Sequence, residues 1–114
     1  MSTKNGMRPV HPGEVLGEEL QDLGMSANAL AGALGVPANR ISAILKGHRG
    51  VTADTALRLS RYFGTTPQLW LNLQQAYEFR VAEIRSAAEI ARRVQLLESE
   101  RNAGNRAGLK VADE

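Results

Sequence analysis

The stretch SANALAGALGVPANRISAIL, residues 26–45, decides the fold, because it is typical of two short helices joined by a tight turn. Ser26 is a favourable N-cap for the first helix, and Gly35 can adopt the left-handed conformation that ends it. Pro37 then favours the start of the second helix, since its fixed φ suits the first helical turn. Both helices are therefore bounded by residues that suit helix ends.

The spacing of small and branched residues within this stretch predicts how the two helices cross. Ala31 is small enough to let the second helix approach closely, and Gly35 supplies the turn four residues later. The β-branched Ile41 follows six residues after that and fills the space between the helices. This is the spacing of a helix-turn-helix, whose second helix enters the major groove of DNA. An ordinary corner between two helices of a structural bundle remains the alternative.

The outward face of the second helix favours the DNA-binding interpretation. Turning Ile41, Ile44 and Leu45 inward leaves short residues and one arginine outside, rather than the Glu/Lys mixture of a solvated helix. Arg40 is the best candidate for bidentate contact with a guanine, and the other predicted base contacts are Asn39, Ser42 and Ala43. For His48, a polar loop role and a phosphate contact are equally open. The full set of predicted phosphate contacts is Ser26, Asn28, Lys46, His48 and Arg49.

Helical periodicity continues on both sides of this pair, and no stretch of the first 80 residues has the alternation of a strand. The first helix is expected to bury Leu16, Leu20 and Leu23. The predicted fold class is all-α, a compact five-helix, lambda-repressor-like bundle. Capping residues and apolar spacing place its helices over residues 12–23, 27–34, 37–46, 53–63 and from 67 onward. The fifth carries on one face Leu69, Trp70, Leu73 and Tyr77.

The two ends of the chain differ from this bundle in composition. Residues 1–10 are expected to be a loose arm, residues 11–80 the helix-turn-helix domain, and residues 81–114 a C-terminal helical extension. A thin apolar stripe among Arg/Glu pairs predicts that the extension either continues the fifth helix or forms a sixth. From residue 102 onward, glycine and charge favour disorder.

Composition excludes several classes of function. The 114 residues include no cysteine and only two histidines, so disulfides, thiol catalysis and a metal cluster are not expected. The longest uncharged run has 17 residues, several of them polar, and no secretion signal opens the chain, so a soluble cytoplasmic protein is expected. Residues 25–63 hold five basic side chains against Asp54 alone, which is the charge pattern of a polyanion-binding protein.

Two segments and their spacing resemble HigA/VapI-type antitoxins of the Xre helix-turn-helix superfamily. They are MRPVHPGEVL, residues 7–16, and the run from SANAL to WLNLQ, residues 26–74. The resemblance implies an antitoxin that neutralises a HigB-like toxin, a RelE-type mRNA endonuclease. It also implies that the homodimer represses its own promoter at a palindromic operator in double-stranded DNA. Matching positions imply base contacts from 39, 40, 42 and 43, phosphate contacts from 26, 28, 46 and 49, and dimer contacts from Trp70, Leu73 and Tyr77.

Two other functions stay open beside the antitoxin. One is a stand-alone Xre-family repressor with no toxin partner, and the other is an interaction module whose helix-turn-helix is vestigial. The basic middle third of the chain counts against the interaction module. An enzyme is the weakest interpretation, because the residues assemble no catalytic triad, phosphate-binding glycine loop, carboxylate pair or metal-ligand spacing. No cofactor, membrane contact or small-molecule substrate is expected.

Overall fold

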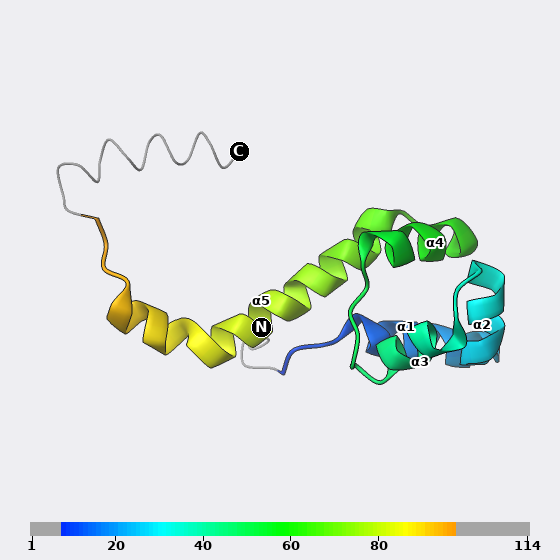
Figure 1. Ribbon diagram of the computed structural model, residues 1–114, viewed down its shortest axis with the longest axis horizontal. Helices are drawn as coiled ribbons and strands as arrows, with labels where there is room; N and C mark the ends of the chain where they lie inside the picture. The colour runs from blue at the N-terminus through cyan, green and yellow to red at the C-terminus, as the bar shows by residue number, and fades with distance from the viewer. Residues whose placement is uncertain (1–7, 98–114) are drawn as a thin grey trace. The chain divides into compact units, whose positions relative to one another are not determined.

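The computed structural model describes residues 8–97, and these form five α-helices with no strand among them (Figure 1). The all-α prediction and the number of helices in the bundle are therefore confirmed. Most of the predicted arm and the predicted disordered tail lie outside the described residues. The helices are α1 Pro12–Leu23, α2 Ala27–Leu34, α3 Ala38–Leu45, α4 Ala53–Phe63 and α5 Pro67–Arg93.

The ends of α2 follow the local sequence closely. The backbone N–H of Ala29 donates to Ser26 Oγ at 3.0 Å, which makes Ser26 the N-cap. Gly35 ends α2 in the left-handed region at a φ of 72°, where a side chain would be strained. Pro37 is the extended N-cap of α3 rather than its first residue, so α3 is one residue shorter than predicted at each end.

The core gathers one apolar stripe from each of the first four helices. Leu16, Leu30, Ile41, Ile44 and Leu59 are fully buried, and they come from α1, α2, α3 and α4. Leu23 was expected to complete the α1 stripe, but its side chain is 54% exposed at the C-terminal end of that helix. Leu69, expected on the same face of α5 as Trp70, is also exposed, whereas Trp70 is buried.

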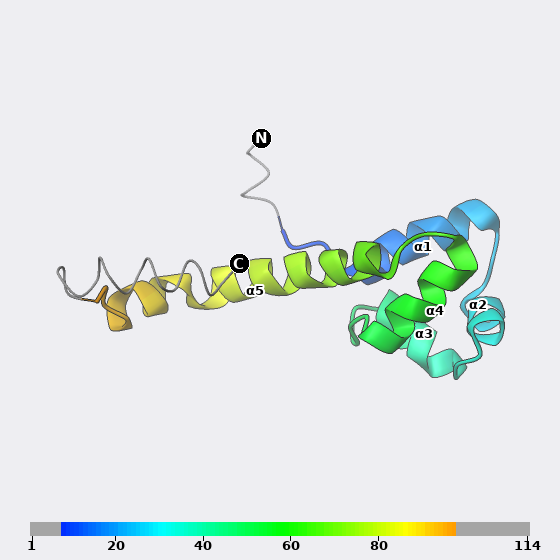
Figure 2. The same ribbon diagram turned by 90° about the horizontal axis from the view of Figure 1, so that it is seen from above.

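Helix α3 is held on two sides, since it packs against α1 and against α2, while α2 also packs against α4 (Figure 2). The crossing of α1 and α3 is close at Gly13, where a Cβ atom would overlap the backbone carbonyl of Ile44. The absence of a side chain at this position therefore sets how deeply α3 sits against α1.

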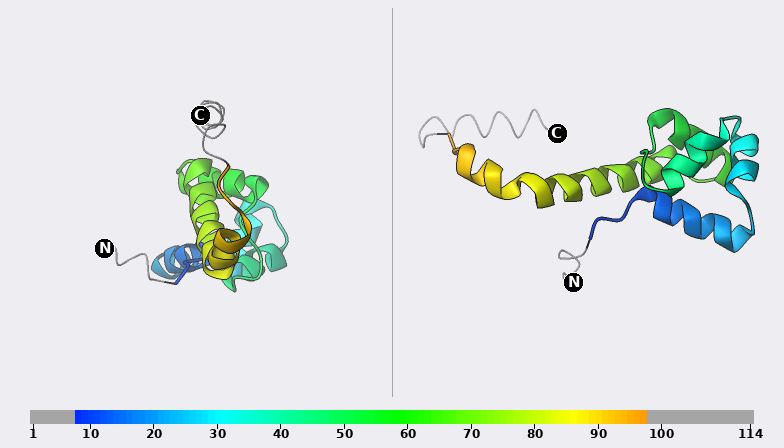
Figure 3. Two further views of the ribbon diagram at one scale, coloured as in Figure 1. Left: turned by 90° about the vertical axis from the view of Figure 1, so that its left-hand side faces the viewer. Right: turned by 60° about the horizontal axis from the view of Figure 1, so that its bottom comes forward.

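Helix α5 runs from Pro67 to Arg93 without interruption, so the predicted extension continues the fifth helix rather than forming a sixth (Figure 3). The described chain divides into two units between Ala82 and Glu83, and α5 contributes residues to both. Among residues 8–97, no helix has the length and apolar character needed to cross a bilayer.

Candidate nucleic-acid interface

The four predicted base contacts on α3 differ in their exposure. Burial of Ile41 and Ile44 fixes which side of α3 faces the core. Asn39 is exposed, and Ser42 and Ala43 are half-buried. Because these side chains are short, the α3 backbone is free to approach a flat or grooved surface closely.

Arg40 differs from the sequence expectation, because it does not project freely outward. Its side chain is only 22% exposed, and its Nη1 donates to Asp54 Oδ2 at 2.7 Å and to Thr55 Oγ1 at 3.4 Å. Its Nε is buried and makes no hydrogen bond within the described residues. The guanidinium is therefore tied to the first turn of α4 through Nη1, which restricts the orientations in which Arg40 could contact a base.

Asp54 joins Arg40 to a second arginine. Arg58 Nε donates to Asp54 Oδ2 at 2.9 Å, an i, i+4 pair within α4. Arg58 Nη1 also donates to the backbone carbonyl of Leu34 at 2.8 Å, at the turn between α2 and α3. We call these three side chains the Arg40–Asp54–Arg58 clamp. The hydrogen bonds from Arg40 and then Arg58 lower the pKa of Asp54, so the carboxylate stays ionised.

The predicted phosphate contacts fall at two places in the fold. Ser26 and Asn28 are exposed at the N-terminus of α2, where unpaired N–H groups favour an anion. The other three, exposed in the segment that follows α3, are Lys46, His48 and Arg49. The structure thus places the basic side chains of Lys46 and Arg49 directly after α3.

Two side chains that the sequence did not mark for function anchor this loop. Gln74 on α5 accepts a hydrogen bond from the backbone N–H of Val51 at 2.7 Å. His11 donates from its ring to the backbone carbonyl of Arg49. His11 is also the N-cap of α1, where its Nδ1 accepts from the backbone N–H of Gly13 at 2.8 Å. The loop is therefore fixed to both α1 and α5.

The environment of His11 predicts that the folded protein becomes less stable at acidic pH. Its side chain is 6% exposed, and burial lowers its pKa below the ordinary value, although Glu14 and the Arg49 carbonyl act in the opposite direction. Protonating Nδ1 would remove the acceptor for Gly13. A depressed histidine pKa means that this stability is complete above about pH 6.5 and is lost as pH falls through the folded-state pKa.

We therefore expect the melting temperature to decrease between pH 7.5 and pH 5.5, and His11→Asn to reduce that decrease because asparagine caps helices without titrating. The pKa of Glu14 is held below its ordinary value by Arg8, so Glu14 titrates at lower pH and does not confuse the comparison. An equal decrease in both proteins would contradict the role of His11. Differential scanning fluorimetry at the two pH values measures the melting temperatures of the wild-type protein and of His11→Asn.

The residues expected in a dimer interface already pack against other side chains of the same chain. Trp70 is 4% exposed and packs near Phe63, with a ring-centroid distance of 6.3 Å, so it has little surface left for a partner subunit. Tyr77 meets His11 edge to face at 4.8 Å, and Leu73 packs partly against the core. Phe79, which sequence analysis did not select, is 65% exposed on the same helix.

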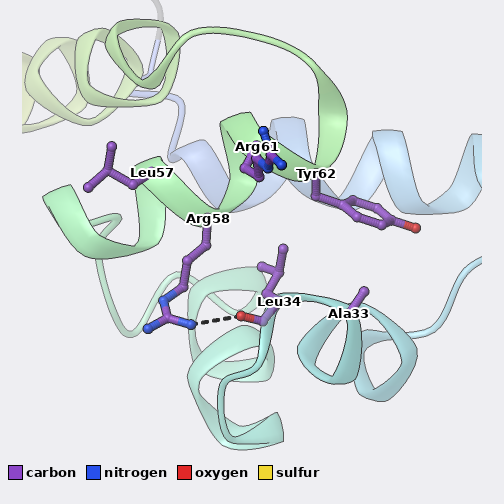
Figure 4. Close-up of a pocket in the computed structure, with 6 residues that line it drawn as sticks. All are labelled: Ala33, Leu34, Leu57, Arg58, Arg61 and Tyr62. Atoms are coloured by element: carbon purple, nitrogen blue, oxygen red, sulfur yellow. Dashed lines mark hydrogen bonds between the residues drawn. The ribbon is translucent and has the colours of Figure 1, made fainter.

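A separate pocket of about 470 Å³ lies between α2 and α4 (Figure 4). Its lining combines apolar side chains with two arginines, and the hydrogen bond from Arg58 to the Leu34 carbonyl joins two of the lining residues. Within residues 8–97, no three acidic or histidine side chains are grouped as a metal would need. The lining residues are Ala33, Leu34, Leu57, Arg58, Arg61 and Tyr62.

Comparisons with known proteins agree with this geometry. A helix-turn-helix family profile matches residues 16–70. Virulence-associated protein I of Dichelobacter nodosus is 57% identical over 81 residues, which cover 70% of this chain and 75% of that protein. The structure of an addiction module antidote protein of the HigA family from Coxiella burnetii is 57% identical, with a TM-score of 0.76 over 78% of this chain and 98% of that one. This chain belongs to the HigA-type helix-turn-helix antitoxins.

A HigA-type antitoxin has also been solved with DNA. The Pseudomonas aeruginosa antitoxin HigA, in a structure with the higBA promoter, is 41% identical to this chain. Its TM-score is 0.77, over 80% of this HigA-type chain and 100% of that one.

Proposed function

We propose that this HigA-type antitoxin represses its own operon by binding an operator as a homodimer. The observation that carries the proposal is the outward face of α3, where Asn39, Ser42 and Ala43 present short side chains beside a cationic loop. A relative of the same fold has been solved with promoter DNA, which supports DNA binding by this chain. Two copies related by two-fold symmetry would address half-sites about 34 Å apart in a palindromic operator.

We assign the base contacts and the phosphate contacts to different residues. Asn39, Ser42 and Ala43 are the proposed base contacts, and Arg40 joins them from its position in the clamp. Residues 11–80 form the proposed DNA-binding and dimerisation domain, with Leu73 and Tyr77 among its dimer contacts and residues 81–114 as its extension. The proposed phosphate contacts are Ser26, Asn28, Lys46, His48 and Arg49.

Replacing Lys46 tests the phosphate role. Lys46 is exposed at the C-cap of α3, and a lysine that neutralises one phosphate releases about one counterion. We expect Lys46→Ala to weaken binding to specific and scrambled duplexes alike, and to reduce the slope of log K against log salt by about 0.9 per subunit. The control is Arg92→Ala on α5, which removes the same charge. A fluorescence-anisotropy titration over a salt series in which both variants behave alike would argue against this contact.

We also propose that the chain neutralises a HigB-like toxin, supported by its membership of the antitoxin family. The test is co-expression with the product of the adjacent reading frame, followed by a growth assay and co-purification. The proposal expects that the neighbour alone arrests growth, that this chain restores it, and that the two proteins co-purify. A neighbour that is harmless alone, or that fails to co-purify, removes the toxin claim and leaves a stand-alone repressor.

A further inference from the structure

The Arg40–Asp54–Arg58 clamp connects three parts of the DNA-binding unit that are distant in sequence. Arg40 lies in the first turn of α3, Asp54 in the first turn of α4, and the Leu34 carbonyl at the turn between α2 and α3. The distances along it are 2.7, 2.9 and 2.8 Å, all within the range of charge-assisted hydrogen bonds. One carboxylate thus fixes the cation nearest the start of the recognition helix.

The side chains of the clamp differ in their exposure to solvent, and this difference bears on the role of Asp54. The Asp54 side chain is 55% exposed, whereas the Arg40 side chain is 22% exposed. Because solvent screens the largely exposed Asp54 carboxylate, its ion pairs with Arg40 and Arg58 stabilise the fold only modestly, so stability does not by itself account for a carboxylate here. A carboxylate next to a phosphate backbone is repelled by it, so Asp54 opposes any DNA complex that does not compensate for its charge.

We propose that Asp54 is a specificity-determining positioning residue, which holds Arg40 in one orientation for base contact and prevents it from gripping phosphates of any sequence. The proposal rests on the proposed operator binding. Because Asp54 engages Nη1, Arg40 has one terminal nitrogen committed before DNA arrives. An arginine held in one orientation can donate only to a base acceptor that lies in its path. An arginine that is free to move can instead reach phosphates at several positions along the DNA, whatever the base sequence.

The test compares wild-type protein and Asp54→Ala on two duplexes. One carries the sequence that the wild-type protein selects from a random library, and the other is a scramble of the same composition. We expect Asp54→Ala to bind the selected duplex about tenfold more weakly, since one restrained base contact is lost. Binding to the scramble should become tighter, with a salt slope steeper by about 0.9 per subunit because the freed Arg40 meets a phosphate.

Three further variants separate positioning from folding and from net charge. Asp54→Asn keeps an acceptor for Arg40 without the charge, so it should retain more of the preference for the selected duplex than Asp54→Ala. The double variant Arg40→Ala/Asp54→Ala should lose the added salt dependence, because Arg40 causes it. Glu89→Ala removes a carboxylate from the exposed pair with Arg93 and should leave the ratio of the two affinities unchanged.

The outcomes distinguish the inference from the function on which it rests. An equal loss on both duplexes with an unchanged salt slope would show that Asp54 only supports the fold, and no change on either duplex would show that it does nothing. Either result overturns the inference while operator binding stands. A wild-type protein that selects no sequence at all would remove the proposed operator binding together with it.

Discussion

Gly13→Ala is expected to destabilise this protein by more than about 3 kcal/mol, a large loss for a single methyl group. The methyl would overlap the backbone carbonyl of Ile44 rather than a side chain that could rotate away. Relief requires α1 and α3 to separate, and that separation breaks contacts of Leu16 and Ile44, both fully buried. Urea unfolding followed by circular dichroism measures the change in free energy.

Gly17 supplies the matched control in the same helix. A Cβ there would meet only Leu45 Cδ2 at 3.8 Å, which is ordinary van der Waals contact. Alanine also favours helix over glycine, so Gly17→Ala should stabilise the protein by about 0.5–1 kcal/mol. Opposite signs for the changes in the free energy of unfolding would establish that the close approach of α1 and α3 leaves no room for a side chain at Gly13. Similar small effects at both positions would refute the close approach at Gly13.

Local signals explain why sequence alone located the helices. Ser26 caps α2 through an N–H three residues away, and Gly35 ends α2 by its own backbone conformation. Both effects depend only on residues that are close together in the chain, so the local sequence is enough to predict them. The boundaries of α1, α2 and α4 were predicted for this reason, and α3 differed by one residue at each end because Pro37 and Lys46 are its caps rather than helical residues.

The side-chain partners could not be predicted in the same way, because they join residues far apart in the chain. Arg40 and Asp54 are separated by 14 positions, and Val51 and Gln74 by 23. Periodicity states that a residue faces outward, but not which neighbouring helix its long side chain reaches. The sequence therefore predicted Arg40 as a base contact without predicting the carboxylate to which it is hydrogen-bonded.

Asn39→Asp should lower operator affinity by about 10- to 100-fold while leaving the fold intact. Asn39 is the second residue of α3 and is exposed. The substitution keeps the shape of the side chain, but replaces its N–H donors with a carboxylate that repels base acceptors and phosphates. In the first turn of a helix a carboxylate is favourable by about 0.3–1 kcal/mol, so thermal stability should stay equal or increase.

Asn28 is the second residue of α2 and provides the informative comparison, since Asn28→Asp places the same charge in the equivalent turn of the neighbouring helix. If Asn28 meets phosphate, its variant should bind selected and scrambled duplexes less well by the same factor. If Asn39 meets a base, Asn39→Asp should lower binding to the selected duplex much more than to the scramble. Asn72→Asp on α5 corrects for net charge. Identical losses for Asn28→Asp and Asn39→Asp on both duplexes would mean that α3 repels DNA through charge alone, and that sequence is read elsewhere.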